Sequence, residues 1–313
     1  MIWRDREPRV PHPSEQVDAA AMAPRAHPGV ELRSVTARAI GFLAHAMRDA
    51  TDHERRTRDD IESALAEAVG PFVTNVAAQP VLPTPGLLRV GGFFQLVDEA
   101  INAAATAVWL GGRTGVAARD LRRLAQAMLL RDVGMVALAP GVRQTSGPLT
   151  RDGWDLMHQH AAHAAAVLDI LDWGDGLMRQ IVRHHHARAA AVAHAAQDAR
   201  LDCAPADFAH LVAIAAVADV FTALTSPRPH RRLPSASDVA GELRRAAGIS
   251  LGRDVVKCLL AAWRPLGATV RQGAGSRPDR AVPTQALGRS ASSRTVNRSE
   301  RPTQRFAWAD RRL

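Results

Sequence analysis

Apolar side chains recur every three or four residues along most of the chain, which is the spacing of helices with one buried face. The pattern predicts helices over residues 34–68, 93–112, 121–129, 154–171, 178–190, 208–224, 235–247 and 251–263. Alanine, the strongest helix former, supplies much of the 47% hydrophobic content, and aromatic residues make up only 4%. We therefore expect an all-α fold, a helical bundle without a sheet.

The pattern divides the chain into four segments. Residues 1–33 are rich in Pro, Arg and His without periodicity and are predicted to be a disordered tail. Residues 34–86 form a helical segment followed by a proline-rich linker, and the charged stretch 49–60 is either a solvated helix or a break. Residues 87–270 are predicted to be the main helical domain, and residues 271–313 a second disordered tail.

The positive charge is concentrated in the C-terminal tail. The chain has a net charge of +9, but residues 271–313 contain ten arginines and three acids, a net charge of +7. The body is therefore close to neutral. An arginine-rich tail can bind nucleic acid or another phosphate polymer non-specifically, and a solvated tail without function is an equal alternative.

The sequence favours a cytoplasmic protein. Its two cysteines, Cys203 and Cys258, lack metal-type spacing and suit a reducing compartment. The first 13 residues are charged and have no apolar core, unlike a secretion signal. No run of about 18 apolar residues is present, so we expect no membrane span.

Asp219 is the only ionisable residue in the stretch 211–224, which is apolar all round and should be a buried helix. A lone buried carboxylate costs several kcal/mol, of order 2–5, unless a cation or hydrogen-bond donors meet it. A metal ion or an arginine is therefore expected beside Asp219. The alternatives are a structural ion pair or a protonated acid.

Histidines form a second candidate cluster. His184, His185 and His186 lie on a predicted helix, where successive residues step by about 100°, so at most two can converge on one site. A solvent-facing run is the alternative. His160 lies on an apolar stripe and is either a ligand or a satisfied core residue.

Arg131 and Asp132 place two adjacent charges inside the apolar run 128–138. Burial of this pair indicates a polar pocket at the turn that follows. The alternative is a local ion pair in which Asp132 caps the turn at Gly134.

The order and spacing of these motifs resemble the HD-GYP family, a class of bacterial all-helical hydrolases that open cyclic di-GMP. The matching segments read LLRDVGMVALAPGV, TSGPLTRDGWDLMHQHAAHAAAVL, IVRHHHAR and IAAVADVFTALTSPRPHRR, within residues 93–263. The resemblance implies an HD-domain-like helical bundle in residues 87–270.

The resemblance also assigns roles. Asp132 matches the metal-bridging Asp of the HD dyad at the catalytic centre, and Arg228 and Arg231 match residues that hold substrate phosphate. The implied metal ligands are Asp132, His160, His185, His186 and Asp219. Imidazoles and carboxylates suit divalent Fe, Mn or Zn, and a pair of such ions would activate water and clamp a phosphodiester.

Several positions depart from the family pattern. The His of the dyad is Arg131, whose guanidinium has no lone pair to offer a metal. The upstream metal-binding His falls at Glu99, which can ligate or pair with Arg131. The Lys after the dyad is Met135, the Glu after the His pair is Ala187, and the chain contains no Tyr for a Gly-Tyr-Pro loop. An alanine-rich stretch, residues 189–199, replaces the recognition loop.

Two hypotheses follow. The first is a metal-dependent cyclic di-GMP phosphodiesterase homologue with a partly lost metal site, one or two ions, and weak or no activity. The second, which we favour, is a non-catalytic nucleotide-binding or scaffolding module, with a cyclic dinucleotide or a protein as partner. In both, we predict that Arg131 takes the place of one metal and pairs with Glu99 or Asp132. Asp132, His160 and one of the His pair would then hold a single ion.

Overall fold

The computed structural model describes residues 28–47, 54–82, 93–138, 150–187, 189–198, 201–226 and 233–263. In these ranges the chain is helical, and one isolated bridge between Ala247 and Leu251 is the only strand-like pairing. The elements are α1 (Pro28–Ala46), α2 (Glu54–Ala77), α3 (Phe93–Arg113), α4 (Ala118–Leu130), a short 3-10 helix η2 (Val133–Ala137), α6 (Arg151–Ile170), α7 (Gly176–His184), α8 (Ala189–Asp198), α9 (Pro205–Thr225), α10 (Ala236–Ala246) and α11 (Arg253–Ala262).

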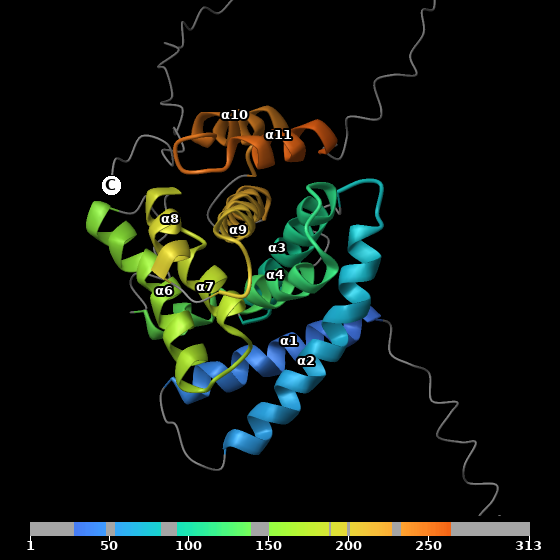
Figure 1. Ribbon diagram of the computed structural model, residues 1–313, viewed down its shortest axis with the longest axis vertical. Coiled ribbons are helices and arrows are strands. Elements are labelled where there is room, and N and C mark those ends of the chain that lie inside the picture. Colours follow the sequence, from blue (N-terminus) through green and yellow to red (C-terminus); the bar gives the residue numbers. More distant parts are fainter. Residues whose placement is uncertain are drawn as a thin grey trace, which may run out of the picture.

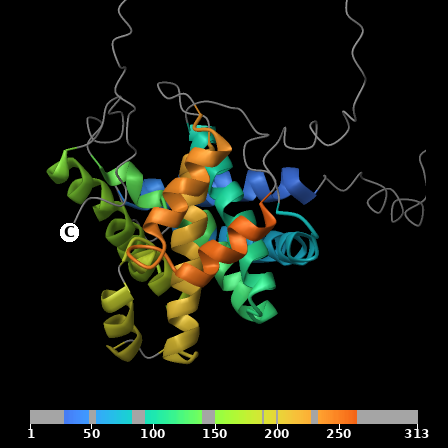
Figure 2. The ribbon, with the colours of Figure 1, turned by 90° about the horizontal axis from the view of Figure 1, so that it is seen from above.

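The apolar helix α9 occupies the centre of the bundle. It packs against α3, α7 and α8, and α10 and α11 cross over it as a covering layer (Figures 1 and 2). The stretch Ala206–Thr225 is long and apolar enough to cross a membrane, but most of it is buried inside the bundle. Its composition is that of a core helix, because neighbouring helices surround it on several sides.

Helices α1 and α2 belong to the same hydrophobic core as the rest of the bundle. They pack on each other and against α3 and α4 (Figure 1). Leu32 and Ile40 of α1 and Leu65 and Val73 of α2 are buried in that common core. The N-terminal helices therefore stabilise the part of the chain that carries the candidate site.

The prediction was wrong at the N-terminus. Helix α1 begins at Pro28, so residues 28–33, predicted to be disordered, are helical. Proline is favoured in the first helical turn, and Leu32 faces the core. Within residues 34–68, where a break in the charged stretch 49–60 was an open alternative, α1 ends at Ala46 and α2 begins at Glu54. Residues 48–53 lie outside the described residues, as do 1–27 and 264–313.

The predicted linker also begins later than expected. Helix α2 continues through Pro71 to Ala77, because Val69 and Val73 are buried on its inner face. Their burial offsets the hydrogen bond that Pro71 removes. Residues 83–92 lie outside the described residues.

Two further helices differ from the prediction in detail. Helix α7 ends at His184, and His185 follows as its C-terminal cap. The alanine-rich stretch forms helix α8. Helix α10 begins as expected, with Ser235 as N-cap in a reciprocal capping box with Asp238.

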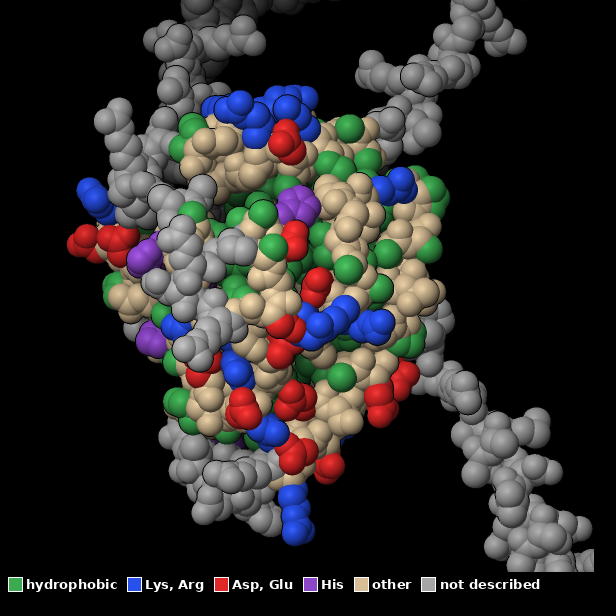
Figure 3. Space-filling view, in the orientation of Figure 1, with side chains coloured by type: hydrophobic (Ala, Val, Ile, Leu, Met, Phe, Trp, Pro, Cys, Tyr) green, Lys and Arg blue, Asp and Glu red, His purple; other side chains and the backbone are tan. Residues whose placement is uncertain are grey.

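Charges on the surface are mostly mixed, as the near-neutral body predicts. On the face shown in Figure 3, acidic and basic side chains lie among one another in the lower half of the view, and a basic group lies over α10 and α11. Arg244 and Arg245 in the last turn of α10 are exposed.

Gly134 allows η2 to lie directly against α6. A Cβ atom at this position would meet the carbonyl oxygen of His160 at 2.0 Å and the backbone nitrogen of Ala164 at 2.6 Å. Backbone atoms cannot rotate away, so Gly134→Ala should destabilise the fold by at least about 2 kcal/mol. Urea denaturation measures this, with Gly70→Ala as the control, because a Cβ on Gly70 meets nothing within 4 Å. Equal stability of the two variants would contradict the close approach.

Candidate metal centre

Three histidines converge from the two helices α6 and α7. The Nε2 atom of His160 lies 3.3 Å from Nε2 of His185 and 3.3 Å from Nε2 of His186. One nitrogen from each ring lies within 4.8 Å of the others. His160 and His185 are buried, and His186 is partly buried. His184 is turned elsewhere, with its ring 6.1 Å from that of Phe208.

Backbone carbonyls set the tautomers of the two buried rings. Nδ1 of His160 donates to the carbonyl of Met157 at 2.6 Å, and Nδ1 of His185 donates to the carbonyl of Val182 at 2.7 Å. Because a carbonyl oxygen only accepts, the Nε2 atoms of the neutral rings carry lone pairs. Without a metal, a proton on Nε2 of His160, which lies 3.2 Å from Asp132 Oδ1, separates these atoms; a metal ion would take the place of that proton and be shared by the Nε2 lone pairs. A tetrahedral zinc site with Zn–N bonds of about 2.0–2.1 Å has this ligand spacing.

The pKa values of His185 and His186 suit metal binding. Burial lowers the pKa of His185 to about 4. Burial, together with the neighbouring imidazoles, lowers the pKa of His186 well below its ordinary value. Both rings are therefore neutral near pH 7, the state in which histidine binds a metal. Burial also acts to lower the pKa of His160, but its hydrogen bond with Asp132 raises the pKa overall.

Two carboxylates complete the site. Asp132 Oδ1 lies 3.2 Å from Nε2 of His160, and Asp219 Oδ2 lies 3.9 Å from Nδ1 of His186. Asp132 follows α4, and Asp219 lies in the last two turns of α9. The structure thus brings Asp132, His160, His185, His186 and Asp219 into one cluster.

Arg131 lies between the two carboxylates. Its Nη2 is 2.8 Å from Asp132 Oδ2, its Nε donates to Asp219 Oδ1 at 2.9 Å, and its Nη1 donates to the carbonyl of Met128 at 2.7 Å. Only 2% of Arg131 is exposed, so these are charge-assisted contacts shielded from water. The arginine expected beside Asp219 is therefore present, and the Asp132 side chain does not cap the Gly134 turn.

Each charge in this group stabilises its neighbour. Burial acts to lower the pKa of Arg131, but Asp132 and Asp219 outweigh it and raise the pKa. Burial acts to raise the pKa of Asp132, and the charge of Arg131 reverses this and holds the pKa well below its ordinary value. Asp132 is thus ionised, and the guanidinium forms an ion pair with each carboxylate.

Glu99 lies on α3 and is partly buried. Its charge also raises the pKa of Arg131, with a smaller effect than those of Asp132 and Asp219. Of the two partners predicted for Arg131, Asp132 forms the ion pair, and Asp219 is a second partner that sequence reasoning missed.

Sequence reasoning also left out His158. Its ring centroid lies 4.7 Å from that of His186 and 5.6 Å from that of Trp154. His158 lies off the main apolar stripe of α6, but its spacing of four residues from Trp154 places both on one face. That spacing was the available signal. Burial lowers the pKa of His158.

The remaining positions implied by the resemblance are placed only in part. Arg228 and Arg231 lie outside the described residues. Met135 lies in η2 and is partly buried, so an apolar side chain occupies the position that the resemblance assigns to a lysine.

Comparison with known proteins supports the resemblance. No protein-family model matches the chain, and no curated protein matches it. Among solved structures, the chain is similar to Bd1817, described as an HDG"Y"P protein from Bdellovibrio bacteriovorus, with a TM-score of 0.52 and 10% sequence identity. The likeness covers 79% of this chain and 76% of that one. At this identity the likeness is one of fold. The chain therefore has the all-α fold of an HD-GYP protein, and the predicted fold class is confirmed.

Proposed function

We propose that the protein is an HD-GYP-like module of bacterial second-messenger signalling that binds one divalent ion and has little or no cyclic di-GMP phosphodiesterase activity. The position of Arg131 between Asp132 and Asp219 is the observation that supports this most directly. By resemblance, these are the carboxylates of a site for two metals. A guanidinium cannot ligate a metal, and here it already forms an ion pair with each of the two carboxylates.

The histidine side of the cluster retains a suitable donor set for one ion. His160, His185 and His186 offer imidazole nitrogens, and Asp132 Oδ1 faces the same region. This set suits divalent Fe, Mn or Zn. One bound ion can lower the pKa of a water molecule, but a phosphodiester cleavage of the two-metal type also needs a second ion on the leaving oxygen.

Binding is accordingly the activity that this chain's residues favour. The guanidinium of Arg131 already pairs with Asp132 and Asp219, and Met135 has no charge. Neither side chain therefore stabilises a phosphate during hydrolysis. The retained cluster lies in a helical fold shared with an HD-GYP protein. We place the module in the cytoplasm, where free cysteines such as Cys203 and Cys258 persist, with a cyclic dinucleotide as its ligand.

Metal analysis of the full-length protein beside a cyclic di-GMP hydrolysis assay tests the proposal. The natural protein should contain about one ion per chain and hydrolyse cyclic di-GMP at a rate near background. The triple variant Glu99→His, Arg131→His, Met135→Lys restores the family-like residues. It should bind a second ion and gain turnover by at least about 100-fold.

Calorimetric titration with cyclic di-GMP completes the test, because binding without turnover distinguishes a nucleotide-binding module from an enzyme. The proposal is wrong if the natural protein holds two ions and hydrolyses cyclic di-GMP at a rate that the triple variant does not exceed.

A further inference from the structure

The three clustered histidines lie on helix α6 or directly after helix α7, and one short turn joins these two helices. His160 is on α6, His185 and His186 follow α7, and residues 171–175 connect the helices. The turn contains two residues in the left-handed region, Asp172 with φ 50° and Gly174 with φ 67°. A non-glycine residue there is strained, so the conformation persists only if surrounding contacts hold it.

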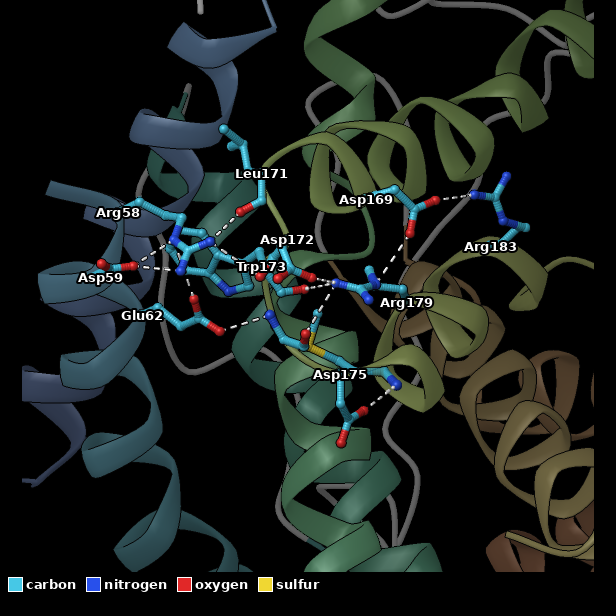
Figure 4. A network of polar contacts seen from close by, with 12 residues as sticks. Arg58, Asp59, Glu62, Asp169, Leu171, Asp172, Trp173, Asp175, Arg179 and Arg183 are labelled. Carbon is cyan, nitrogen blue, oxygen red and sulfur yellow. Dashed lines mark hydrogen bonds and ion pairs between the residues drawn. The ribbon is translucent and has the colours of Figure 1, made fainter. Parts of the chain in front are cut away.

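Helix α2 supplies those contacts. Arg58 Nη1 donates to the carbonyls of Leu171 and Asp172, the latter at 3.3 Å, and Glu62 Oε1 accepts from the backbone nitrogen of Gly174 at 2.7 Å (Figure 4). Nε of Arg58 also lies 3.7 Å from Oε2 of Glu62, so an ion pair helps to hold the two side chains in place. The strained backbone is therefore held from a helix about 110 residues earlier in the chain.

Helix α7 contacts the same turn from the other side, through Arg179. Arg179 donates to the Asp172 carboxylate at 2.9 Å and to the carbonyl of Gly174 at 3.1 Å, and it pairs with Asp169 at 3.2 Å (Figure 4). Trp173 is buried, and its ring centroid lies 6.0 Å from that of Phe42 in α1. The turn is thus fixed between the N-terminal helices and the helix that leads to His185.

A displacement of this turn would reach the histidines. Helix α7 has nine residues and is about 13 Å long. The side chains on its buried face are closely packed, so the helix moves as a rigid unit. Movement at its first turn therefore shifts its C-terminal end, where His185 lies 3.3 Å from His160 across the site. Changes of well under 1 Å alter metal coordination, because ligand distances are specific to about 0.2 Å.

We propose that Arg58 and Glu62 are positioning residues for the histidine cluster, through which the N-terminal helices α1 and α2 set the affinity of the site for a metal ion. This inference rests on the proposed metal binding. A contact that only stabilised the fold would lower the melting temperature of the protein without changing the affinity of the folded state.

The experiment measures Zn²⁺ affinity of the full-length protein by competition with a chelating dye. Arg58→Gln and Glu62→Gln should each weaken Zn²⁺ binding by about 10-fold, the range for residues that orient metal ligands. Arg58→Lys, which keeps one charged donor, should fall between Arg58→Gln and the natural protein. Arg56→Gln is the control on α2, because Arg56 is exposed.

Loss of stability is separated from loss of positioning by Val256→Ala, which removes buried volume on α11, outside the cluster. It should lower the melting temperature and leave Zn²⁺ affinity unchanged. The inference is overturned if Arg58→Gln and Glu62→Gln behave in the same way as Val256→Ala.

A metal-free measurement keeps the two proposals distinguishable. Histidine ring ¹H–¹⁵N spectra report the Nδ1–H groups of His160 and His185, which donate to backbone carbonyls. If the natural protein binds no Zn²⁺ but Arg58→Gln shifts these signals and Arg56→Gln does not, the proposed function fails and the positioning role stands. Unchanged ring signals in Arg58→Gln overturn the positioning role.

Discussion

Arg131→Met is expected to destabilise the metal-free protein by about 3–5 kcal/mol, because it removes the guanidinium that pairs with both Asp132 and Asp219 in a largely buried site. Methionine has similar length and suits an apolar neighbourhood, so lost packing contributes little. For a domain of this size, the change corresponds to a fall in melting temperature of about 10 °C.

Divalent metal should reverse much of this loss. With the guanidinium gone, the two carboxylates become free to ligate, and an added ion can compensate the charge that Arg131 compensated. A site filled at 100 times its dissociation constant stabilises a protein by about 2.7 kcal/mol. Excess Mn²⁺ or Zn²⁺ should therefore raise the melting temperature of Arg131→Met by several degrees more than that of the natural protein.

The matched control is Arg119→Met in the first turn of α4, the helix that Arg131 caps at its C-terminal end. Arg119 pairs with Asp202 at the surface, and its side chain is 69% exposed, so its loss should leave the melting temperature nearly unchanged. If Arg131→Met is as stable as Arg119→Met and gains nothing extra from metal, then Arg131 does not replace an ion.

The helical fold was predictable because its signal is local. Apolar spacing marked the helices, and the cap at Ser235 marked the start of α10. The need of Asp219 for a cation was also predictable, since an acid on an apolar helix must be compensated wherever that helix packs.

Which residues pair with Arg131 was harder to predict from the sequence. Arg131 and Asp219 are 88 residues apart, and their pairing depends on how α4 and α9 pack. Apolar periodicity does not encode that geometry, so the prediction named Asp132, which does pair with Arg131, but not Asp219. The extension of α2 through Pro71 has the same origin, because burial of Val69 and Val73 overrides a local helix-breaking signal.

The contacts of Arg58 could not be predicted from the sequence. An arginine in a charged helical stretch is usually solvated, but besides Asp59 the acceptors of Arg58 here are backbone carbonyls of a turn. Backbone acceptors have no residue signature, so only the packed structure reveals them. The strain in the turn arises at Asp172, a non-glycine residue in the left-handed region, and the sequence pattern does not mark this position.

His186→Ala is expected to weaken Zn²⁺ binding by more than 100-fold. Loss of a side chain that merely orients a ligand costs about 10–100-fold, and His186 is a direct donor in the proposed site. Its side chain is 19% exposed, so its removal should disturb the fold less than removal of the buried His185.

The adjacent residue provides the control for this change. His184→Ala removes an identical side chain that contacts Phe208 rather than the cluster, so it should change Zn²⁺ affinity by no more than about 2-fold. Competition with a chelating dye gives both affinities, and chelator treatment should lower the melting temperature of the natural protein and of His184→Ala but leave that of His186→Ala unaffected. Equal loss of affinity in the two variants would show that the ion binds elsewhere, since only a site at His160, His185 and His186 distinguishes neighbours in the same histidine run.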